Sequence, residues 1–92
     1  MIEGFRCKDT ARLWETGSNR RFANLAQAAL RKLMMLDAAE TLDDLRVPPA
    51  NHLEAMKRDR AGQHSIRINR QWRLCFRWLN GRALDVEITD YH

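Results

Sequence analysis

Apolar and polar residues alternate along three stretches in the second half of the chain, and this period of two is typical of β-strands with one buried face. The apolar positions are Ile66 and Ile68 in the first stretch, Trp72, Leu74, Phe76 and Trp78 in the second, and Leu84, Val86 and Ile88 in the third. Asn69-Arg70 and Asn80-Gly81 separate the stretches, and an Asn-Gly pair strongly favours a tight hairpin turn. The second half therefore predicts an antiparallel meander.

The first half of the chain shows a helical period instead. Its apolar residues recur at helical spacing at Phe22, Leu25, Ala26, Ala29, Leu33 and Leu36. They predict a long amphipathic helix that reaches about Ala39. Before it, Asp9 and Thr10 can cap a shorter helix that stops near Gly17.

Shorter signals lie around these helices. Ile2-Glu3-Gly4-Phe5-Arg6 is a candidate for a short N-terminal strand. Thr41-Leu42-Asp43-Asp44 resembles a capping box, with Asp in place of Glu, and predicts one short helical turn. Pro48-Pro49 ends any helix and predicts an extended connection to the meander.

Together these elements predict a single α+β domain over residues 1–92, with an N-terminal strand, two helices and then a small antiparallel sheet. Amphipathic helices need a sheet face to bury against, and the apolar positions of the meander supply it. The opposite face is then expected to present Arg67, Arg73 and Arg77 to solvent. Arginines in such positions either keep an open sheet face soluble or bind an anion.

The composition limits the class of protein further. The chain has 92 residues and is 45% hydrophobic, which is enough for one modest core. No stretch approaches the roughly 20 apolar residues of a membrane span, and the first residues lack the pattern of a signal peptide, so we expect a cytoplasmic protein without a membrane partner. Cys7 and Cys75 form no CxxC pair, and His52 and His64 lack metal-ligand spacing, so no disulfide, metal or cofactor is expected.

Positive charge is concentrated between residues 57 and 82. This stretch holds eight basic residues and one acid, Asp59, whereas the whole chain has a formal net charge of +4. The basic residues are Lys57, Arg58, Arg60, Arg67, Arg70, Arg73, Arg77 and Arg82. A cluster of this density favours a polyanionic partner, and RNA is the first candidate.

The sequence closes with Asp90-Tyr91-His92, directly after the last alternating stretch. A carboxylate, a phenol and an imidazole are groups that transfer protons, and an unperturbed imidazole titrates near neutrality, at roughly pH 6.5. Strict alternation puts Tyr91 on the face opposite Asp90 and His92, so the three converge only if the strand twists or bulges at its end. Acid–base groups beside a cationic surface suit chemistry on RNA.

Several blocks of the sequence resemble the HigB-like toxins of the RelE superfamily. They are Met34-Met35-Leu36-Asp37-Ala38-Ala39, Asp59-Arg60-Ala61-Gly62, Ser65-Ile66-Arg67-Ile68-Asn69, Trp72-Arg73-Leu74-Cys75-Phe76 and the closing Asp90-Tyr91-His92. The resemblance covers essentially the whole chain. It implies a compact fold with helices on one side of a small sheet and an RNA-binding face on the other. It also implies a bacterial toxin that cuts messenger RNA on the ribosome.

The resemblance also implies partners for this chain, and the chain departs from the family pattern at one position. The implied partners are messenger RNA, the ribosome, a helix-turn-helix antitoxin similar to HigA and, through that antitoxin, operator DNA. Many relatives carry a Leu-His-Pro-Leu-Lys-Gly stretch whose His is implicated in activity, and the corresponding run here is Leu53-Glu54-Ala55-Met56-Lys57-Arg58. Glu54 at that position can act as a base or accept a hydrogen bond, but it cannot act as a cation. His52 shares its strand face if the stretch is extended.

Metal-free cleavage of RNA needs a base for the ribose 2′-OH, a cation for the phosphorane and an acid for the leaving 5′-oxygen. We hypothesise that His92 is the acid or base and that Tyr91 stacks on a base or donates a hydrogen bond. Asp90 would fix the His92 ring or position RNA, while Arg73 and Lys57 would stabilise the phosphate. The candidate catalytic residues are therefore His92, Tyr91, Asp90, Glu54 and Arg73, and the candidate RNA-binding residues are Lys57, Arg58, Arg60, Arg67 and Arg77.

Two other functions fit the same residues. The first is a non-catalytic RNA- or DNA-binding module whose closing residues serve in packing. The second is a degenerate toxin that acts only in the antitoxin complex and in operator control. Replacing His92 separates these functions from a nuclease, because a binder keeps its affinity and has no cleavage to lose.

Overall fold

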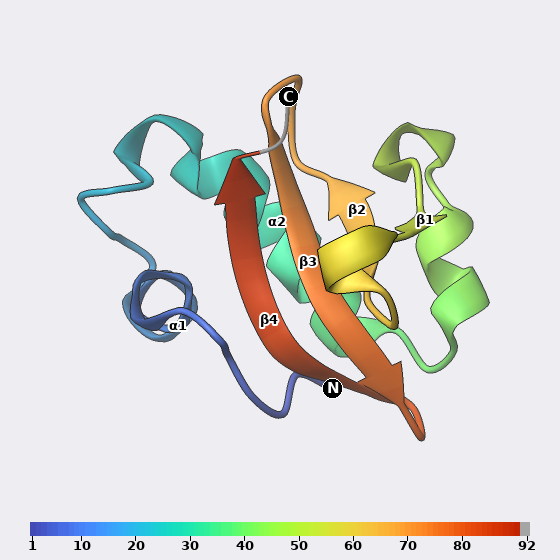
Figure 1. The fold of residues 1–92 in the computed structure, drawn as a ribbon. Helices are drawn as coiled ribbons and strands as arrows, with labels where there is room; N and C mark the ends of the chain where they lie inside the picture. The colour runs from blue at the N-terminus through green and yellow to red at the C-terminus, as the bar shows by residue number, and fades with distance from the viewer. Residues whose placement is uncertain (91–92) are drawn as a thin grey trace.

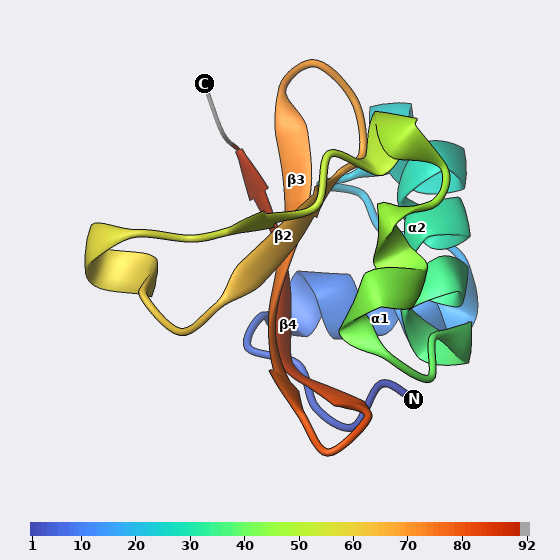
Figure 2. The same ribbon diagram turned by 90° about the vertical axis from the view of Figure 1, so that its right-hand side faces the viewer.

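The computed structural model describes residues 1–90, which form a four-stranded antiparallel sheet with helices on one face (Figure 1). The strands β1 (Glu54–Ala55), β2 (His64–Arg67), β3 (Trp72–Leu79) and β4 (Arg82–Asp90) lie in the sheet in chain order. The helices α1 (Lys8–Thr16) and α2 (Ala26–Ala38) cover one face, and the β1–β2 connection projects from the other, here called the outer face (Figure 2). The predicted α+β class, with two helices on one face of the sheet, is confirmed.

The core lies between α2 and the inner face of the sheet. α2 begins at Ala26, later than the helical period predicted, because residues Ala23–Leu25 form a 3₁₀ turn. Phe22 is nonetheless fully buried, and its ring meets the Trp72 ring edge to face with 5.8 Å between centroids. The predicted stripe packs as expected, with buried positions at Leu25, Ala29, Leu33, Leu36, Ile66, Leu74, Phe76, Val86 and Ile88.

α1 ends where the sequence predicted. Gly17 adopts φ 81°, a left-handed conformation that favours glycine, and its N–H donates a 2.8 Å hydrogen bond to the carbonyl of Leu13. The start of the helix differs from the prediction, because Cys7 is the N-terminal cap and Asp9 and Thr10 lie within the first turn.

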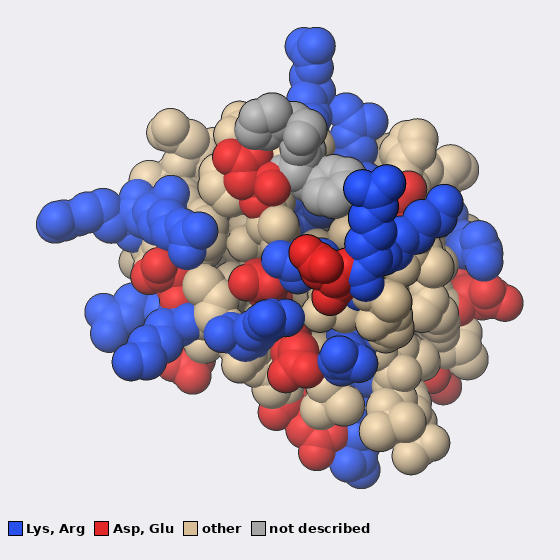
Figure 3. Space-filling model, in the orientation of Figure 1, with Lys and Arg blue, Asp and Glu red and all other residues tan. Residues whose placement is uncertain are grey.

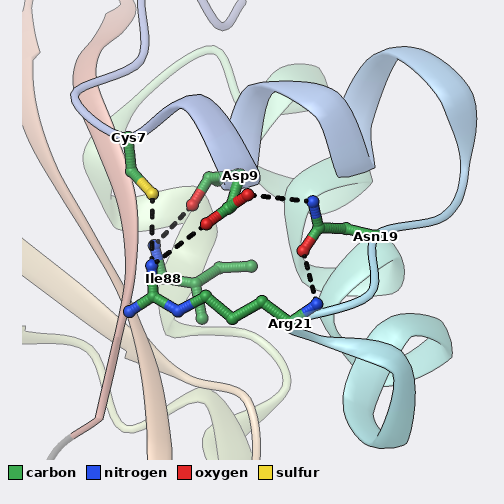
Figure 4. A network of polar contacts seen from close by, with 6 residues as sticks. Cys7, Asp9, Asn19, Arg21 and Ile88 are labelled. Atoms are coloured by element: carbon green, nitrogen blue, oxygen red, sulfur yellow. Dashed lines mark hydrogen bonds and ion pairs between the residues drawn. The ribbon is translucent and has the colours of Figure 1, made fainter.

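Asp9 and Thr10 fasten α1 to its neighbours instead of capping it. The Asp9 carboxylate accepts hydrogen bonds from Asn19 at 3.1 Å and Arg21 at 3.4 Å, in the connection to α2 (Figure 4). The buried Thr10 hydroxyl accepts a 3.1 Å hydrogen bond from the backbone N–H of Ile88 in β4. None of the helices in residues 1–90 has the length and apolar character that a membrane crossing requires.

The predicted N-terminal strand is not formed. Ile2 and Phe5 make only isolated parallel bridges, to Ala83 and Val86 of β4 respectively. Between these two contacts, Asp85 has φ 52° at a bulge of β4. The bulge removes the regular spacing that a continuous ladder along this edge would need.

The same bulge decides which residues of β4 face the core. Asp85 is an extra residue in β4 relative to β3, so the residues of β4 before it face the opposite side from the one that strict alternation predicts. Ala83 is fully buried and pairs with Trp78, whereas Leu84 pairs with Arg77 on the outer face. The prediction that Leu84 belongs to the apolar core face is therefore wrong, because strict alternation does not anticipate an inserted residue.

Both predicted turns connect neighbouring strands. Asn80 and Gly81 have φ 52° and 77°, the left-handed conformations of a two-residue hairpin turn between β3 and β4. In the β2–β3 connection, Asn69 Oδ1 accepts 2.9 Å hydrogen bonds from the backbone N–H groups of Gln71 and Trp72. The β2–β3 turn is thus shaped by a side chain.

The connection from α2 to β1 follows the prediction in part. Thr41 and Asp44 form the predicted capping box, which opens the 3₁₀ helix Leu42–Arg46. After Pro48, however, Pro49–Asn51 is a further 3₁₀ turn and not an extended segment. Proline at the start of a helical turn loses no hydrogen bond, because the first N–H groups of a helix have no partner within it.

Candidate active site

Arg73 is the central basic residue of the outer face, and only 8% of its surface is exposed. Its Nε donates a 2.8 Å hydrogen bond to the Ser65 hydroxyl, and its Nη2 donates to the carbonyl oxygens of His52 and Ser65. The Glu54 carboxylate, opposite Ser65 in the β1–β2 pair, lies 3.7 Å from the same Nη2. The prediction that Arg73 projects into solvent is wrong, because the segment leading into β1 and the neighbouring strand cover its guanidinium.

An open pocket of about 250 Å³ lies beside this guanidinium. Its lining residues are His52, Glu54, Arg67, Asn69, Arg70 and Arg73. Arg67 is held at the pocket by a 3.1 Å hydrogen bond from its Nε to the carbonyl of Asn69. Three arginines against one carboxylate make the pocket cationic, and planar guanidinium groups match the geometry of a phosphate.

Three of these lining residues were not predicted as site residues. The sequence places Asn69 and Arg70 in a turn and Arg70 in the basic cluster, and a basic side chain at the tip of a hairpin inside that cluster is a usable signal for a site residue. His52 has φ 44°, so the expectation that an extended segment puts it on one face with Glu54 is wrong. It still lines the pocket, because its own carbonyl binds Arg73.

The end of β4 reaches the same corner of the sheet. Asp90 pairs with Trp72 at the start of β3, and its Oδ2 accepts a 3.0 Å hydrogen bond from Nε2 of Gln71. Asp90 is thereby held beside the β2–β3 hairpin that lines the pocket. The other two candidates for proton transfer, Tyr91 and His92, lie outside the described residues.

The connection from β1 to β2 carries three predicted RNA-binding residues across the outer face (Figure 2). Lys57 and Arg58 are exposed and line a second pocket of about 560 Å³, which shares Glu54 with the first. Arg60 differs, because its Nη1 donates a 2.9 Å hydrogen bond to the Glu87 carboxylate on β4, and this contact raises the pKa of Arg60.

Arg77 lies farther along the outer face. Its Nε is 3.2 Å from the Asp85 carboxylate, with both side chains about half exposed. At about 3.3 Å per residue along a strand, its Cα is roughly 13 Å from that of Arg73, and it does not line the Arg73 pocket. Figure 3 shows acidic side chains interspersed with the basic ones on this face.

The two cysteines are free thiols in different surroundings. Cys75 is fully buried on the outer face, and burial raises the pKa of its thiol, which keeps it protonated at neutral pH. Cys7 is partly exposed at the start of α1. Among residues 1–90, no three His, Cys, Asp or Glu side chains lie close enough together to hold a metal ion.

Comparison with known proteins identifies the family. Residues 3–92 match the model of the RelE-like toxin HigB of type II toxin–antitoxin systems. The chain belongs to the HigB-like family. Toxin HigB-1 of Vibrio cholerae serotype O1 is 41% identical over 69 residues, which cover 75% of this chain and 73% of that toxin. Endoribonuclease HigB of Proteus vulgaris is 30% identical over 93 residues, and the match covers both chains completely.

The fold of this HigB-like chain is also seen in a more distant protein. The crystal structure of YafQ from Escherichia coli BL21(DE3) superposes with a TM-score of 0.65 at 15% identity, covering 98% of this chain and 91% of YafQ. The HigB-like identity predicted from the sequence blocks is confirmed. A type II toxin is paired with a cognate protein antitoxin, and in this HigB-like toxin the Arg73 pocket is the best candidate for the active site.

Proposed function

We propose that this HigB-like toxin is an endoribonuclease that cleaves messenger RNA on the ribosome. The observation that carries the proposal is the Arg73 pocket, where Arg67 and Arg70 surround a guanidinium already fixed by Ser65 and His52. Charge-assisted hydrogen bonds from such groups bind phosphate strongly. The full-length relative from Proteus vulgaris is named an endoribonuclease, which supports the same activity here.

Arg73 is the residue that stabilises the phosphorane in this proposal. Its hydrogen bonds to Ser65 and His52 hold the guanidinium before substrate arrives, so little reorganisation is needed as charge develops on the phosphate. Lys57, exposed beside Glu54, supplies a second cation to the same phosphate or to its neighbour. Arg67, which lines the Arg73 pocket, binds the same phosphate or its neighbour, and Arg58 and Arg77 contact the phosphates farther along the RNA.

Proton transfer is assigned to the residues that follow β4 and to Glu54. Attack by the ribose 2′-OH on the adjacent phosphorus requires a base, and departure of the 5′-oxygen requires an acid. His92 serves as one of these groups, with Asp90 orienting it and Tyr91 stacking on a base or donating a hydrogen bond. Glu54, next to Arg73, is a carboxylate base for the 2′-OH. The products are a 2′,3′-cyclic phosphate and a 5′-hydroxyl.

The proposed partners follow from the same family. Messenger RNA on the ribosome is the substrate, and a helix-turn-helix antitoxin similar to HigA is the cognate inhibitor. Through that antitoxin the complex binds operator DNA, and the toxin acts in the cytoplasm. No metal or other cofactor takes part in the proposed chemistry.

The ends of the cleavage products test this proposal. Purified toxin is incubated with ribosomes carrying a defined messenger RNA, and the fragments are analysed for their end groups. The proposal predicts 5′-hydroxyl ends that polynucleotide kinase labels directly and 3′ ends that carry a cyclic phosphate. Fragments with 5′-phosphate ends would contradict attack by the 2′-OH. Ribosome binding without any fragments would favour the non-catalytic binding module.

A further inference from the structure

Arg60 and Glu87 form an ion pair that joins the β1–β2 connection to β4. Arg60 Nη1 lies 2.9 Å from Glu87 Oε1, and the two side chains are only 28% and 22% exposed. The same Nη1 is 3.2 Å from the side-chain oxygen of Gln63. The pair spans 27 residues of sequence and crosses the outer face over β3.

The connection that Arg60 belongs to is anchored on the sheet at its two ends. We call residues 56–63 the strap. Its two ends are closed by a 2.9 Å hydrogen bond from the Met56 N–H to the Gln63 carbonyl. Met56 and Gln63 are 9% and 2% exposed. Cys75, which pairs with Glu87 on the outer face, is fully buried although neither α1 nor α2 covers that face. The strap is thus packed against this part of the sheet at its ends, while Lys57, Arg58 and Asp59 are exposed.

The strap has three further backbone hydrogen bonds, and one of them runs from the Gln63 N–H to the Arg60 carbonyl at 3.0 Å. In the other two, the Arg60 N–H donates to the Lys57 carbonyl at 3.1 Å, and the Ala61 N–H donates to the Arg58 carbonyl at 3.0 Å. Arg58 itself adopts φ 56°, a conformation that an arginine rarely takes. Fixing Arg60 therefore also fixes the turn that carries Lys57 and Arg58.

Lys57 and Arg58 lie next to the candidate active site. They line the pocket of about 560 Å³ that Glu54 shares with the Arg73 pocket. Their positive charges therefore extend the cationic surface around Arg73. The Arg60 guanidinium instead contacts the Glu87 carboxylate, so its charge is already paired.

We infer that Arg60 and Glu87 are positioning residues, which latch the strap to β4 so that Lys57 and Arg58 contact the phosphates of RNA bound at the Arg73 pocket. The inference rests on the proposed function. It gives Arg60 a role other than direct RNA binding. It also gives a role to Glu87, an acidic residue on a face that binds an anion.

The first test measures, without any RNA, whether the Arg60–Glu87 pair holds the strap closed. Glu87→Ala removes the partner of Arg60, and limited trypsin digestion then reports the opening of the strap at Lys57 and Arg58. Loss of a charge-assisted hydrogen bond should speed cleavage at these two sites by about tenfold under native conditions. The matched control is Glu3→Ala, which removes the carboxylate of the exposed Glu3–Arg82 pair and should leave the strap sites unchanged. Equal rates of digestion at the strap sites of wild type, Glu87→Ala and Glu3→Ala would contradict the proposed role of the Arg60–Glu87 pair.

The second test couples the latch to RNA binding. Affinity for ribosomes carrying messenger RNA is measured for Lys57→Ala/Arg58→Ala, in the wild-type background and with Glu87→Ala. In the wild-type background the loss of two phosphate contacts should weaken binding and reduce the salt dependence, lowering the slope of log K against log salt by about 1–2. With Glu87→Ala already present, the same change should have little further effect. The exchanged pair Arg60→Glu/Glu87→Arg should restore the wild-type behaviour.

The outcomes separate this inference from the proposed function. A wild-type protein that neither binds programmed ribosomes nor cuts RNA would refute the proposed function and, with it, the role of the latch. A wild-type protein that cuts RNA, but in which the Glu87 and Lys57/Arg58 changes are additive, would refute only the inference. An exchanged pair that stays defective in both tests would also refute it.

Discussion

Arg73 Nε donates a 2.8 Å hydrogen bond to the Ser65 hydroxyl, and both residues are buried on the outer face of the sheet, opposite α1 and α2. A buried guanidinium needs partners, because an unpaired charge away from water is costly. The carbonyl oxygens of His52 and Ser65 and the nearby Glu54 carboxylate supply them. The residue proposed to stabilise the transition state is therefore also part of the folded structure.

Replacing Arg73 should consequently affect stability and cleavage together, but to different degrees. Arg73→Ala leaves the Ser65 hydroxyl and the His52 carbonyl without this donor, which should cost about 1–3 kcal/mol of unfolding free energy. Cleavage should fall further, by about 10²–10³-fold, because the preorganised cation is lost. Urea denaturation and the rate of cleavage on ribosomes measure the two effects.

Arg82→Ala is the matched control for that substitution. Arg82 is exposed at the β3–β4 hairpin and pairs with Glu3, away from the Arg73 pocket. An exposed pair of this kind contributes about 0–1 kcal/mol, so this variant should retain both stability and cleavage. A cleavage defect in Arg73→Ala that disappears once its rates are corrected for the unfolded fraction would make Arg73 purely structural.

The core between α2 and the sheet predicts a large effect at Leu33. Leu33 is fully buried in the cluster that includes Phe76 and Ile88, so Leu33→Ala should lower the unfolding free energy by about 2–5 kcal/mol. Met34, the next residue, is 62% exposed, and Met34→Ala should change it by less than about 0.5 kcal/mol. Chemical denaturation of both variants checks the assignment, and similar losses for the two would contradict the described packing.

The capping box before the 3₁₀ helix Leu42–Arg46 predicts a pH-dependent contribution from Asp44. The backbone N–H groups of Thr41 and Glu40 donate to its carboxylate and lower the pKa of Asp44 below its ordinary value. A pKa lowered by folding stabilises the protein above the unfolded value of about 3.9, and this stabilisation is lost as the pH falls through the folded pKa.

Asp44→Asn should therefore lower the melting temperature at neutral pH, and the difference from wild type should shrink in acid below about pH 4. Asp43→Asn removes the same charge one residue earlier, where the carboxylate contacts only the exposed Arg46 among the described residues. Thermal melts of the two variants across this pH range distinguish the loss of the capping hydrogen bonds from the loss of one negative charge. A deficit at Asp44 that is constant with pH would contradict the assigned hydrogen bonds.

The amino-acid pattern predicted the architecture because two strong periodicities are present. The helical stripe ending near Leu36 and the alternation through Leu74 and Phe76 each have one apolar face, and burying both faces together leaves few arrangements. The exception was the bulge at Asp85, which depends on contacts along the sheet and not on the local pattern. It moved Leu84 to the outer face and prevented a regular strand at the N-terminus.

The site was predictable in its residue types but less so in its geometry. Alternation correctly put Arg73 on the outer face, since its Cα partners there are Arg67 and Thr89. It could not show that Arg73 is buried, because the covering groups come from a turn near His52 and a neighbouring strand. The pairing of Arg60 with Glu87 could not be predicted from the local sequence pattern either, since the two residues are 27 positions apart.

We propose that this HigB-like toxin cleaves RNA by acid–base catalysis in which His92 transfers a proton. The most direct measurement compares wild type and His92→Gln for the rate of messenger RNA cleavage on ribosomes, together with ribosome affinity and melting temperature. Glutamine keeps hydrogen-bonding groups but does not titrate near neutral pH. We expect unchanged affinity and melting temperature, with cleavage reduced by about 10²–10⁴-fold. Cleavage at the wild-type rate would contradict a role for His92 in the mechanism.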